Sequence, residues 1–316
     1  MTKHVFGSSE ESESRQPRWG LGTSAAIHHA LDLGLAFAPT DHPLVILGEP
    51  GTGKTTFARY IHEISGRPGP FVTFYAGVTT DSLHTEELFG HSRGAYTGAH
   101  DDRTGLVEAA REGTLFLDDL NLATAAVQRS LLTLFNKSGF LRLGDRRPRP
   151  INTRIIAASN EDLNEMAKVG RFRRDLLGRF GYAAIEMPPL RERRDEILPL
   201  FRYFLRHQSP HREKDWDLSP EVESLLLVAP WPGNVRDVET VAWYAATVAH
   251  LTDVLEVSHL PPNFLRALGI DPAHPTGSMT ERVQRVLEQT GGNKSKAARQ
   301  LGVNRRTIQW HSKSEP

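Results

Sequence analysis

The chain of 316 residues contains no cysteine. Disulfide bonds and metal sites built on thiolates are therefore excluded, and the absence agrees with a cytoplasmic location. The chain also lacks an apolar run of membrane-spanning length, which would need roughly 18 residues. Residues 1–15 are polar and acidic, without the apolar centre of an export signal. We expect a cytoplasmic protein that has no membrane partner.

Neither sign of charge predominates. Lysine and arginine together number 38, as do aspartate and glutamate, so the total charge predicts no particular partner. The 14 histidines occur without an HExxH pattern or cysteine companions, which argues against a metal site built on histidine. With 39% hydrophobic and 24% charged residues, the composition is that of a soluble globular chain with room for two or three domains.

The stretch Gly48-Glu-Pro-Gly-Thr-Gly-Lys-Thr55 has the pattern of a phosphate-binding loop. It lies between a short apolar run at 44–47 and helix-compatible residues at 57–61. In this strand, loop and helix order, backbone N–H groups converge on phosphate oxygens at the helix N-terminus. Lys54 supplies charge to the terminal phosphates, and the Thr55 hydroxyl can ligate Mg²⁺. We therefore predict an ATP site. Its residues in the loop are Gly48, Glu49, Pro50, Gly51, Thr52, Gly53, Lys54, Thr55 and Thr56.

Polar residues follow two further apolar runs. The run at 114–117 ends in Asp118 and Asp119, at the edge of a parallel sheet where such folds collect ligand chemistry. We expect Asp118 to hold Mg²⁺ through water and Asp119 to orient or deprotonate the attacking water. Two solvated acids that open the next helix are the alternative for either residue alone. The run at 154–160 ends in small polar residues that could sense the terminal phosphate.

Cations crowd residues 170–179. Arg173 and Arg179 are six residues apart on an expected helix and its exit, so both could project toward a nucleotide held by a neighbouring subunit. An arginine provided in trans can be worth roughly 10³ to 10⁵ in turnover. The alternative is an ordinary solvated face, which most charge runs form.

A segment rich in small residues surrounds one aromatic side chain, Tyr96, between the phosphate-binding loop and the acidic strand. It has no periodicity that would build a core, so it suits an exposed, mobile loop whose tip touches a partner. An ordinary turn is the alternative. The predicted contact residues are Gly94, Ala95, Tyr96, Thr97, Gly98 and Ala99.

The C-terminal segment is basic and has the pattern of a helix-turn-helix. From residue 280 onward there are eight lysines and arginines against three glutamates. Gly291 and Gly292 end one predicted helix, Asn293 caps the next over 294–301, and Gly302 permits a tight turn before a second helix. In this motif the second helix enters the major groove of DNA. The expected DNA-contacting residues are Asn304, Arg305, Arg306, Thr307 and Gln309. A basic helical pair that merely caps the preceding domain is the alternative.

These motifs together resemble the AAA+ domain of bacterial enhancer-binding proteins, the ATPases that activate sigma-54 RNA polymerase. The resemblance spans residues 20–262, and the C-terminal segment resembles the Fis-type DNA-binding end of the same proteins. The loop Gly94-Ala-Tyr-Thr-Gly-Ala99 is similar to the sigma-contacting signature of the family. Four further stretches occur in the family's order and spacing: Gly113-Thr-Leu-Phe-Leu-Asp118, Phe172-Arg-Arg-Asp-Leu176, Pro188-Pro-Leu-Arg-Glu-Arg193 and Trp231-Pro-Gly-Asn-Val-Arg236.

The resemblance implies an α/β fold: an AAA+ P-loop core with a parallel sheet and a helical lid subdomain, plus a C-terminal all-α helix-turn-helix. It further implies a homo-oligomer, a hexameric ring, that hydrolyses ATP between subunits and moves the loop against the sigma-54 RNA polymerase holoenzyme while bound to upstream double-stranded DNA. The expected domains are a flexible tail at 1–19, the core at 20–188, the lid at 189–262, a linker at 263–279 and the DNA-binding domain at 280–316.

Roles for individual residues follow from the same resemblance. Ser159 and Asn160 match the first sensor, Arg173 and Arg179 match the arginines supplied in trans, and Arg236 matches the second sensor, which contacts nucleotide and reports its state to the lid. Only a short tail precedes the expected core, so we also expect control by a trans-acting inhibitor or co-activator.

The sequence departs from the family pattern at four positions. Asp119 stands where Glu is usual, and its carboxylate is one methylene shorter, which predicts slower turnover. Tyr75 stands at the Asn that pairs with that Glu, Thr55 replaces a frequent Glu, and Tyr96 replaces Phe. Two alternatives stay open: a DNA-binding regulator that uses ATP only to assemble, with weak or lost hydrolysis, and another AAA+ protein remodeller.

Overall fold

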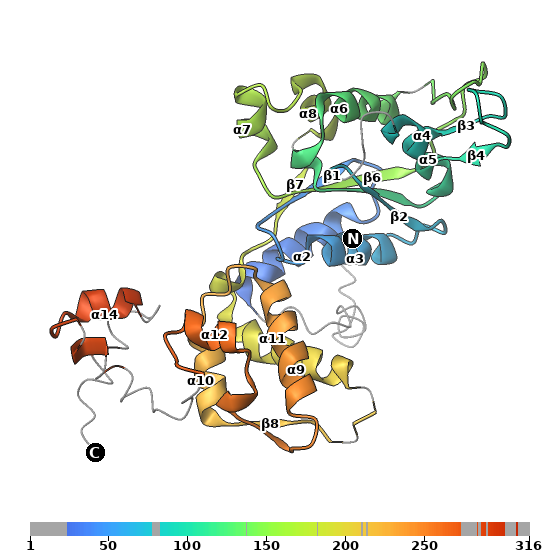
Figure 1. Ribbon diagram of the computed structural model, residues 1–316. Helices are drawn as coiled ribbons and strands as arrows, with labels where there is room; N and C mark the ends of the chain where they lie inside the picture. The colour runs from blue at the N-terminus through green and yellow to red at the C-terminus, as the bar shows by residue number, and fades with distance from the viewer. Residues whose placement is uncertain are drawn as a thin grey trace, which may run out of the picture. The chain divides into compact units, whose positions relative to one another are not determined.

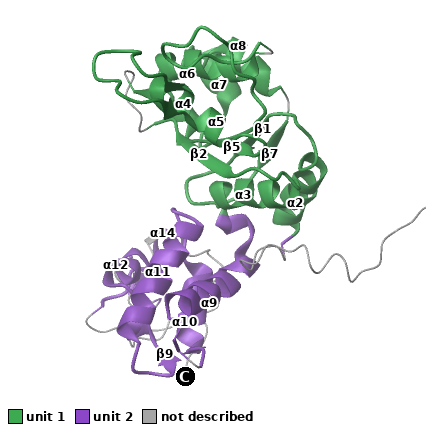
Figure 2. Cartoon of the chain, turned by 90° about the vertical axis from the view of Figure 1, so that its right-hand side faces the viewer, with its two compact units in different colours: residues 1–17, 25–189 green, residues 18–24, 190–316 purple. Residues whose placement is uncertain are grey.

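The computed structural model of the protein is shown in Figure 1. It describes residues 24–77, 83–136, 138–181, 183–209, 211–212, 214–272, 283, 286–288, 290–300 and 308. The chain divides into two compact units, residues 25–189 and residues 190 onward together with Ser24 (Figure 2).

The first unit is built on a five-stranded parallel sheet in the order β2-β5-β6-β1-β7. β1 is a continuous apolar run, and β5 and β6 are buried along nearly their whole length, as expected for a sheet covered on both faces. Because all strands run the same way, the carboxyl ends of β1, β5 and β6 meet at one edge. The strands are β1 Leu44–Leu47, β2 Phe71–Tyr75, β5 Thr114–Asp118, β6 Arg154–Ser159 and β7 Ala184–Glu186.

Helices cover both faces of this sheet: α2 and α3 lie on one side, and α4, α6, α7 and α8 lie on the other (Figures 1 and 2). The helices are α2 Ala25–Phe37, α3 Lys54–Ile64, α4 His84–Phe89, α5 Leu106–Ala109, α6 Ala125–Leu131, α7 Leu163–Lys168 and α8 Arg174–Phe180. Short 3-10 helices follow β5 and α6, η1 at Leu120–Leu122 and η2 at Leu132–Phe135. A small antiparallel hairpin pairs β3 Gly90–His91 with β4 Arg103–Thr104.

A buried arginine fastens α2 to the sheet. Arg154, at the start of β6, donates to the carbonyl oxygens of Phe37 and Ala38 at 2.7 and 2.6 Å, which the end of α2 leaves without helical partners. Burial lowers the pKa of Arg154 to about 10, and the guanidinium stays charged at neutral pH. The contact holds in a fixed place the strand that leads to Asn160.

The second unit is helical, with a core formed mainly between α9 and α11. The sequence sets its helix ends locally: the Ser219 hydroxyl accepts from the Val222 N–H at the start of α10, and Pro220 occupies the first turn. The helices are α9 Ile197–Gln208, α10 Pro220–Val228, α11 Val235–Val248 and α12 Pro262–Ala267. One parallel pair, β8 Asp217–Leu218 with β9 Val254–Leu255, and the 3-10 helices η3 Leu190–Glu192, η4 Arg194–Glu196 and η5 Val257–His259 complete it.

Farther along the chain, helix α14 spans Lys294–Gln300. Asn293 caps the helix, as predicted, its Oδ1 accepting from the N–H groups of residues 295 and 296 at 3.2 and 3.0 Å, and Gly291 and Gly292 before it take positive φ angles. Val283, Ala297 and Ile308 belong to a small apolar core of their own. None of the described helices is both long enough and apolar enough to cross a membrane. The predicted fold class, a parallel-sheet α/β core with a helical subdomain, is confirmed for the part of the chain described.

Candidate nucleotide and loop site

The phosphate-binding loop connects β1 directly to α3. Gly53 immediately precedes α3 and has a φ of 99°, a left-handed conformation that glycine adopts at no steric cost. Thr52, fully buried, donates its hydroxyl to the Glu49 carbonyl at 2.9 Å and closes the loop on itself. The loop is therefore preformed, with the N-terminus of an 11-residue helix behind it.

Lys54 is the first residue of α3, and its side chain is folded across the loop. Its Nζ donates to the carbonyl oxygens of Gly48 and Glu49 at 2.8 and 2.9 Å and to Oδ1 of Asn160. An ammonium group held by carbonyl oxygens can exchange them for phosphate oxygens when an anion enters the loop. The lysine is thus placed at the mouth of the loop and linked to the end of β6.

Asp118, the last residue of β5, and Asp119, the residue after it, make different hydrogen bonds. Asp118 accepts from the Thr55 hydroxyl at 3.1 Å and from the Asp119 N–H at 3.0 Å. Burial and, secondarily, the neighbouring Asp119 charge raise the pKa of Asp118. The Thr55 hydroxyl and the Asp118 carboxylate are both oxygen ligands of the kind that a divalent cation binds. A bound cation would favour the charged form of Asp118, which the raised pKa disfavours.

Asp119 has left-handed backbone angles, φ 51° and ψ 46°. This conformation turns its side chain toward β6, where it accepts from Nδ2 of Asn160 at 3.0 Å. Asp and Asn tolerate such a conformation better than most residues, because their short polar side chains can bond locally. Tyr75, at the end of β2, is 52% exposed and pairs in register with Asp118. The donor to Asp119 is Asn160, the residue that follows β6.

Asn160 is the junction of the site. Its Oδ1 accepts from Lys54, its Nδ2 donates to Asp119, and its backbone N–H donates to Oδ1 of Asn121 at 3.1 Å. The Ser159 hydroxyl donates to the Glu161 carbonyl at 2.6 Å and is fully buried, so it shapes the end of the strand. No local pattern in the sequence marks Asn121, because its contact partner lies 39 positions away.

The two arginines predicted to act in trans lie at opposite ends of α8. The helix begins at Arg174, so Arg173 is its N-cap, and Arg179 lies in the last turn. Arg173 forms a bidentate contact with Asp175, at 3.0 and 2.6 Å, while its backbone N–H donates to Oε1 of Gln128 at 2.9 Å. Both arginines are exposed on the surface of the first unit.

The glycine-rich loop is the connection between β3 and β4. It is folded back on itself by hydrogen bonds from the Gly94 N–H to the Ala99 carbonyl at 2.8 Å and from the Ala99 N–H to the Tyr96 carbonyl at 3.0 Å. The Tyr96 ring packs edge-on against His91 at 5.2 Å, and its hydroxyl donates to Oε2 of Glu86 at 3.3 Å. Tyr96 is 47% exposed and Thr97 is exposed, so the loop presents both at its surface.

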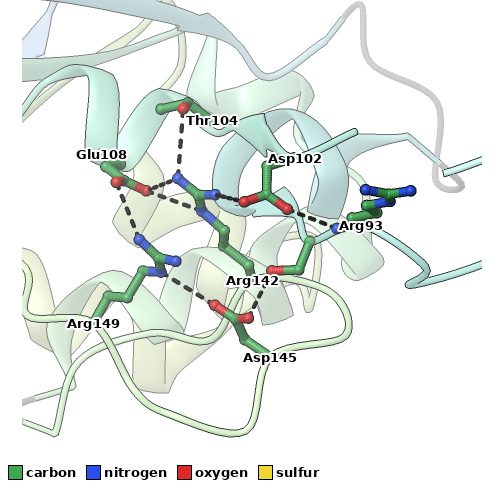
Figure 3. Close-up of polar contacts among 8 residues, drawn as sticks. Arg93, Asp102, Thr104, Glu108, Arg142, Asp145 and Arg149 are labelled. Carbon is green, nitrogen blue, oxygen red and sulfur yellow. Dashed lines mark hydrogen bonds and ion pairs between the residues drawn. The ribbon is translucent and has the colours of Figure 1, made fainter. Parts of the chain in front are cut away.

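Polar contacts join the base of this loop, and helix α5 beside it, to a second loop at 142–149 (Figure 3). Buried Arg142 donates twice to Glu108, at 3.0 and 2.5 Å, and lies 4.0 Å from Asp102. The Ser92 hydroxyl donates to Asp145 at 2.6 Å and is the chief cause of the lowered pKa of that carboxyl. The two loops are therefore held together at their bases.

The remaining predicted residues lie elsewhere. Arg236 is in the first turn of α11, in the second unit, and its side chain is exposed. The stretch 231–236 also contains Asn234, which supports the fold. Asn234 is buried, and its Oδ1 accepts from the Leu190 N–H at 2.8 Å. The predicted DNA-contacting residues Asn304, Arg305, Arg306, Thr307 and Gln309 lie outside the described residues.

A strand, a glycine-rich loop with its lysine, an acidic pair on the next strand but one and a polar sensor on the strand between define a P-loop ATPase of the AAA+ class. The family comparisons identify it further. The sigma-54 interaction domain model matches residues 21–186, the AAA+ ATPase lid domain matches 191–274, and the bacterial regulatory protein, Fis family, matches 280–309. The chain belongs to the sigma-54 interaction domain family.

Bacterial regulatory proteins are similar to this chain over most of its length. The chain is 36% identical over 307 residues to the transcriptional regulatory protein ZraR of Klebsiella oxytoca, covering 94% of this chain and 69% of ZraR. It is 37% identical over 310 residues to the regulatory protein AtoC of Escherichia coli K12, covering 93% and 67%. The crystal structure of NtrX from Brucella abortus in complex with ATP is similar, with a TM-score of 0.70 and 26% identity over 96% of this chain and 70% of NtrX.

These findings confirm the predicted class: the protein is an ATPase and a sigma-54-dependent transcriptional activator with a Fis-type helix-turn-helix for DNA. Nucleotide binding is confirmed with it.

Proposed function

We propose that this activator hydrolyses Mg²⁺-bound ATP at the edge of the sheet where β1, β5 and β6 end, using a neighbouring subunit of a hexameric ring to complete the site. The observation that supports this most strongly is the convergence of Lys54, Asp119 and Asn160 in one hydrogen-bonded group behind the phosphate-binding loop. Charge, base and sensor are then within reach of one terminal phosphate.

Thr55 and Asp118 would hold the magnesium ion, Asp118 through water. Their oxygens, 3.1 Å apart, are the donor type that Mg²⁺ prefers. When bound, the ion would neutralise charge on the phosphate oxygens. The backbone N–H groups of residues 48–56 would bind the phosphates, and Asp119, aligned by Asn160, would orient the attacking water and accept its proton.

Arg173 and Arg179 would act on nucleotide held by the adjacent subunit, and Arg236 would report the nucleotide state to the lid. Asp175 holds the Arg173 guanidinium in this single chain, at 2.6 Å, so a phosphate would have to replace an existing carboxylate partner. Both partners are exposed, so this exchange costs little.

The folded loop at 94–99 would be the part that contacts sigma-54, in the cytoplasm, on a promoter with an upstream DNA site. Tyr96 and Thr97 would touch the sigma factor, and the helix-turn-helix residues from Asn304 to Gln309 would hold the DNA. Hydrolysis would release the loop from its contacts with Glu86 and His91 and move it against the polymerase.

The test separates hydrolysis from contact. The Thr97 side chain is exposed, and Thr97→Ala should leave the ATPase rate unchanged while abolishing open-complex formation by sigma-54 polymerase. Thr247→Ala, an exposed threonine in α11 that donates only to the Trp243 carbonyl, is the matched control and should behave as the wild type in both assays. Normal open-complex formation by Thr97→Ala would remove the loop from the proposal.

A further inference from the structure

A buried asparagine lies two residues beyond the proposed base. Asn121, on η1, is 8% exposed. Its Oδ1 accepts from the Asn160 N–H at 3.1 Å and lies 3.5 Å from the Ser159 hydroxyl, whose proton is donated to the Glu161 carbonyl. Its contacts therefore fix the backbone that carries Asn160, and through Asn160 the carboxylate of Asp119.

The Asn121 side chain also interacts with Glu161, which lies nearer the surface. Hydrogen bonds from Arg171 and, to a smaller degree, from Asn121 lower the pKa of Glu161. Arg171 donates to both carboxylate oxygens of Glu161, at 2.7 and 3.0 Å. An exposed ion pair of this kind contributes little to stability by itself. Here it joins the end of β6 to the segment that leads into Arg173.

A second connection runs in parallel. Gln128, buried in α6, donates from Nε2 to the Ala123 carbonyl at 2.9 Å and to the Arg171 carbonyl at 3.1 Å. Its Oε1 accepts from the Arg173 N–H at 2.9 Å. Both connections begin in residues 119–123 and end in residues 171–173, so the segment after the acidic pair is tied to the base of the proposed trans arginine.

We propose that Asn121 is a positioning residue for ATP hydrolysis: it holds Asn160 against Asp119 and couples the phosphate-sensing end of β6 to the segment that presents Arg173. This inference rests on the roles proposed above for Asn160 and Arg173. Asn121 touches neither nucleotide nor water in this account, and it acts through the residues that do.

The expected effect is on the chemical step. Asn121→Ala removes the acceptor for the Asn160 N–H and frees the end of β6 to shift, and a displacement of about 1 Å at a reacting group can cost about 100-fold. We expect kcat to fall about tenfold or more, while KM for ATP stays within about twofold because the phosphate-binding loop is untouched.

Two further variants separate positioning from folding. Asn121→Asp keeps the acceptor for the Asn160 N–H but loses the donor to Glu161 and places two carboxylates together, so kcat should also fall. Adding Glu161→Gln to Asn121→Asp restores a donor and acceptor pair with reversed polarity, and kcat should recover at least severalfold. Melting temperature separates the two roles, because a residue needed only for folding would lose and regain kcat in step with melting temperature.

The experiment measures phosphate release by the full chain with Mg²⁺ and ATP, together with nucleotide affinity and melting temperature. Asn263→Ala, which removes an exposed asparagine bonded to Arg266 in α12, is the control expected to match the wild type. A kcat for Asn121→Ala within twofold of the wild type would overturn the inference. So would equal losses of kcat, affinity and melting temperature, or no recovery in the double variant.

Asn160→Ala is measured in parallel. We expect it to lose turnover while binding nucleotide. If Asn160→Ala were fully active, the sensor role proposed for it would be wrong, whatever Asn121→Ala did. If Asn160→Ala were inactive and Asn121→Ala normal, only the inference about Asn121 would be wrong.

Discussion

Replacing the proposed base with its closest neutral analogue is the sharpest perturbation of the ATPase site. Asp119→Asn is isosteric, and asparagine tolerates the left-handed backbone at φ 51° as well as aspartate does. Its Oδ1 can still accept from Nδ2 of Asn160, now at 3.0 Å. The substitution therefore removes the proton acceptor and leaves the surrounding geometry in place.

The magnitude follows from what is removed. A positioned general base contributes about 10² to 10⁴ in rate, or about 2.7 to 5.5 kcal/mol of transition-state stabilisation. Loss of the Asp119 charge also lowers the pKa of Asp118, because that charge is the second cause of its elevation after burial. Metal and nucleotide binding should consequently be retained or tightened while turnover falls at least about 100-fold.

The assay is phosphate release at saturating Mg²⁺ and ATP, with nucleotide affinity measured separately. Asp32→Asn, on the exposed side of α2, is the control for loss of one negative charge and should hydrolyse ATP normally. Turnover by Asp119→Asn within threefold of the wild type would refute the assignment of Asp119 as the base. It would equally refute the expectation that a shorter acid still acts at this position.

Three further predictions follow from single contacts. Arg173→Ala should cut turnover by about 10³ or more and spare nucleotide binding; normal hydrolysis would disprove a role in trans. Tyr96→Phe removes only the hydrogen bond to Glu86, so amide exchange in the loop should quicken by about twofold to fivefold at an unchanged ATPase rate; unaltered exchange would show that the hydroxyl does not restrain the loop. The folded state raises the pKa of Asp118, so this group's contribution to stability falls as pH rises from its unfolded pKa through its folded pKa. Asp118→Asn should thus raise the melting temperature at neutral pH without Mg²⁺ and abolish Mg²⁺-dependent hydrolysis, and a lowered melting temperature would contradict this sign.

Much of the fold could be predicted because its signals are local. The apolar run at 44–47 and the glycines of the phosphate-binding loop are adjacent in sequence, and they are β1 and the start of α3 in the structure. The cap at Asn293 is likewise set by neighbours two and three residues away. Such elements follow from periodicity and capping without knowledge of tertiary contacts.

The hydrogen bonds that connect the residues of the site could not be predicted in the same way, because they join positions far apart in the sequence. Asn121 and Gln128 contact backbone groups 39 and 45 positions away, and nothing in their own surroundings in the sequence marks them. Arg173 was expected on a helix, but its backbone is extended, at φ −75° and ψ 130°, so it is the N-cap and the helix begins one residue later. Its N–H, which a helix start leaves without a helical partner, donates to Gln128. The return of Tyr96 onto Glu86 and His91 also depends on a hairpin whose register only the folded chain fixes.

The central claim is that cleavage of ATP drives the loop at 94–99 against sigma-54. It is tested most directly by permanganate reactivity of promoter thymines in a sigma-54 promoter complex, with the full chain and either ATP or a non-hydrolysable analogue. We expect a melted promoter with ATP, and no melting with the analogue at concentrations that saturate binding. Equal melting with both nucleotides would contradict it.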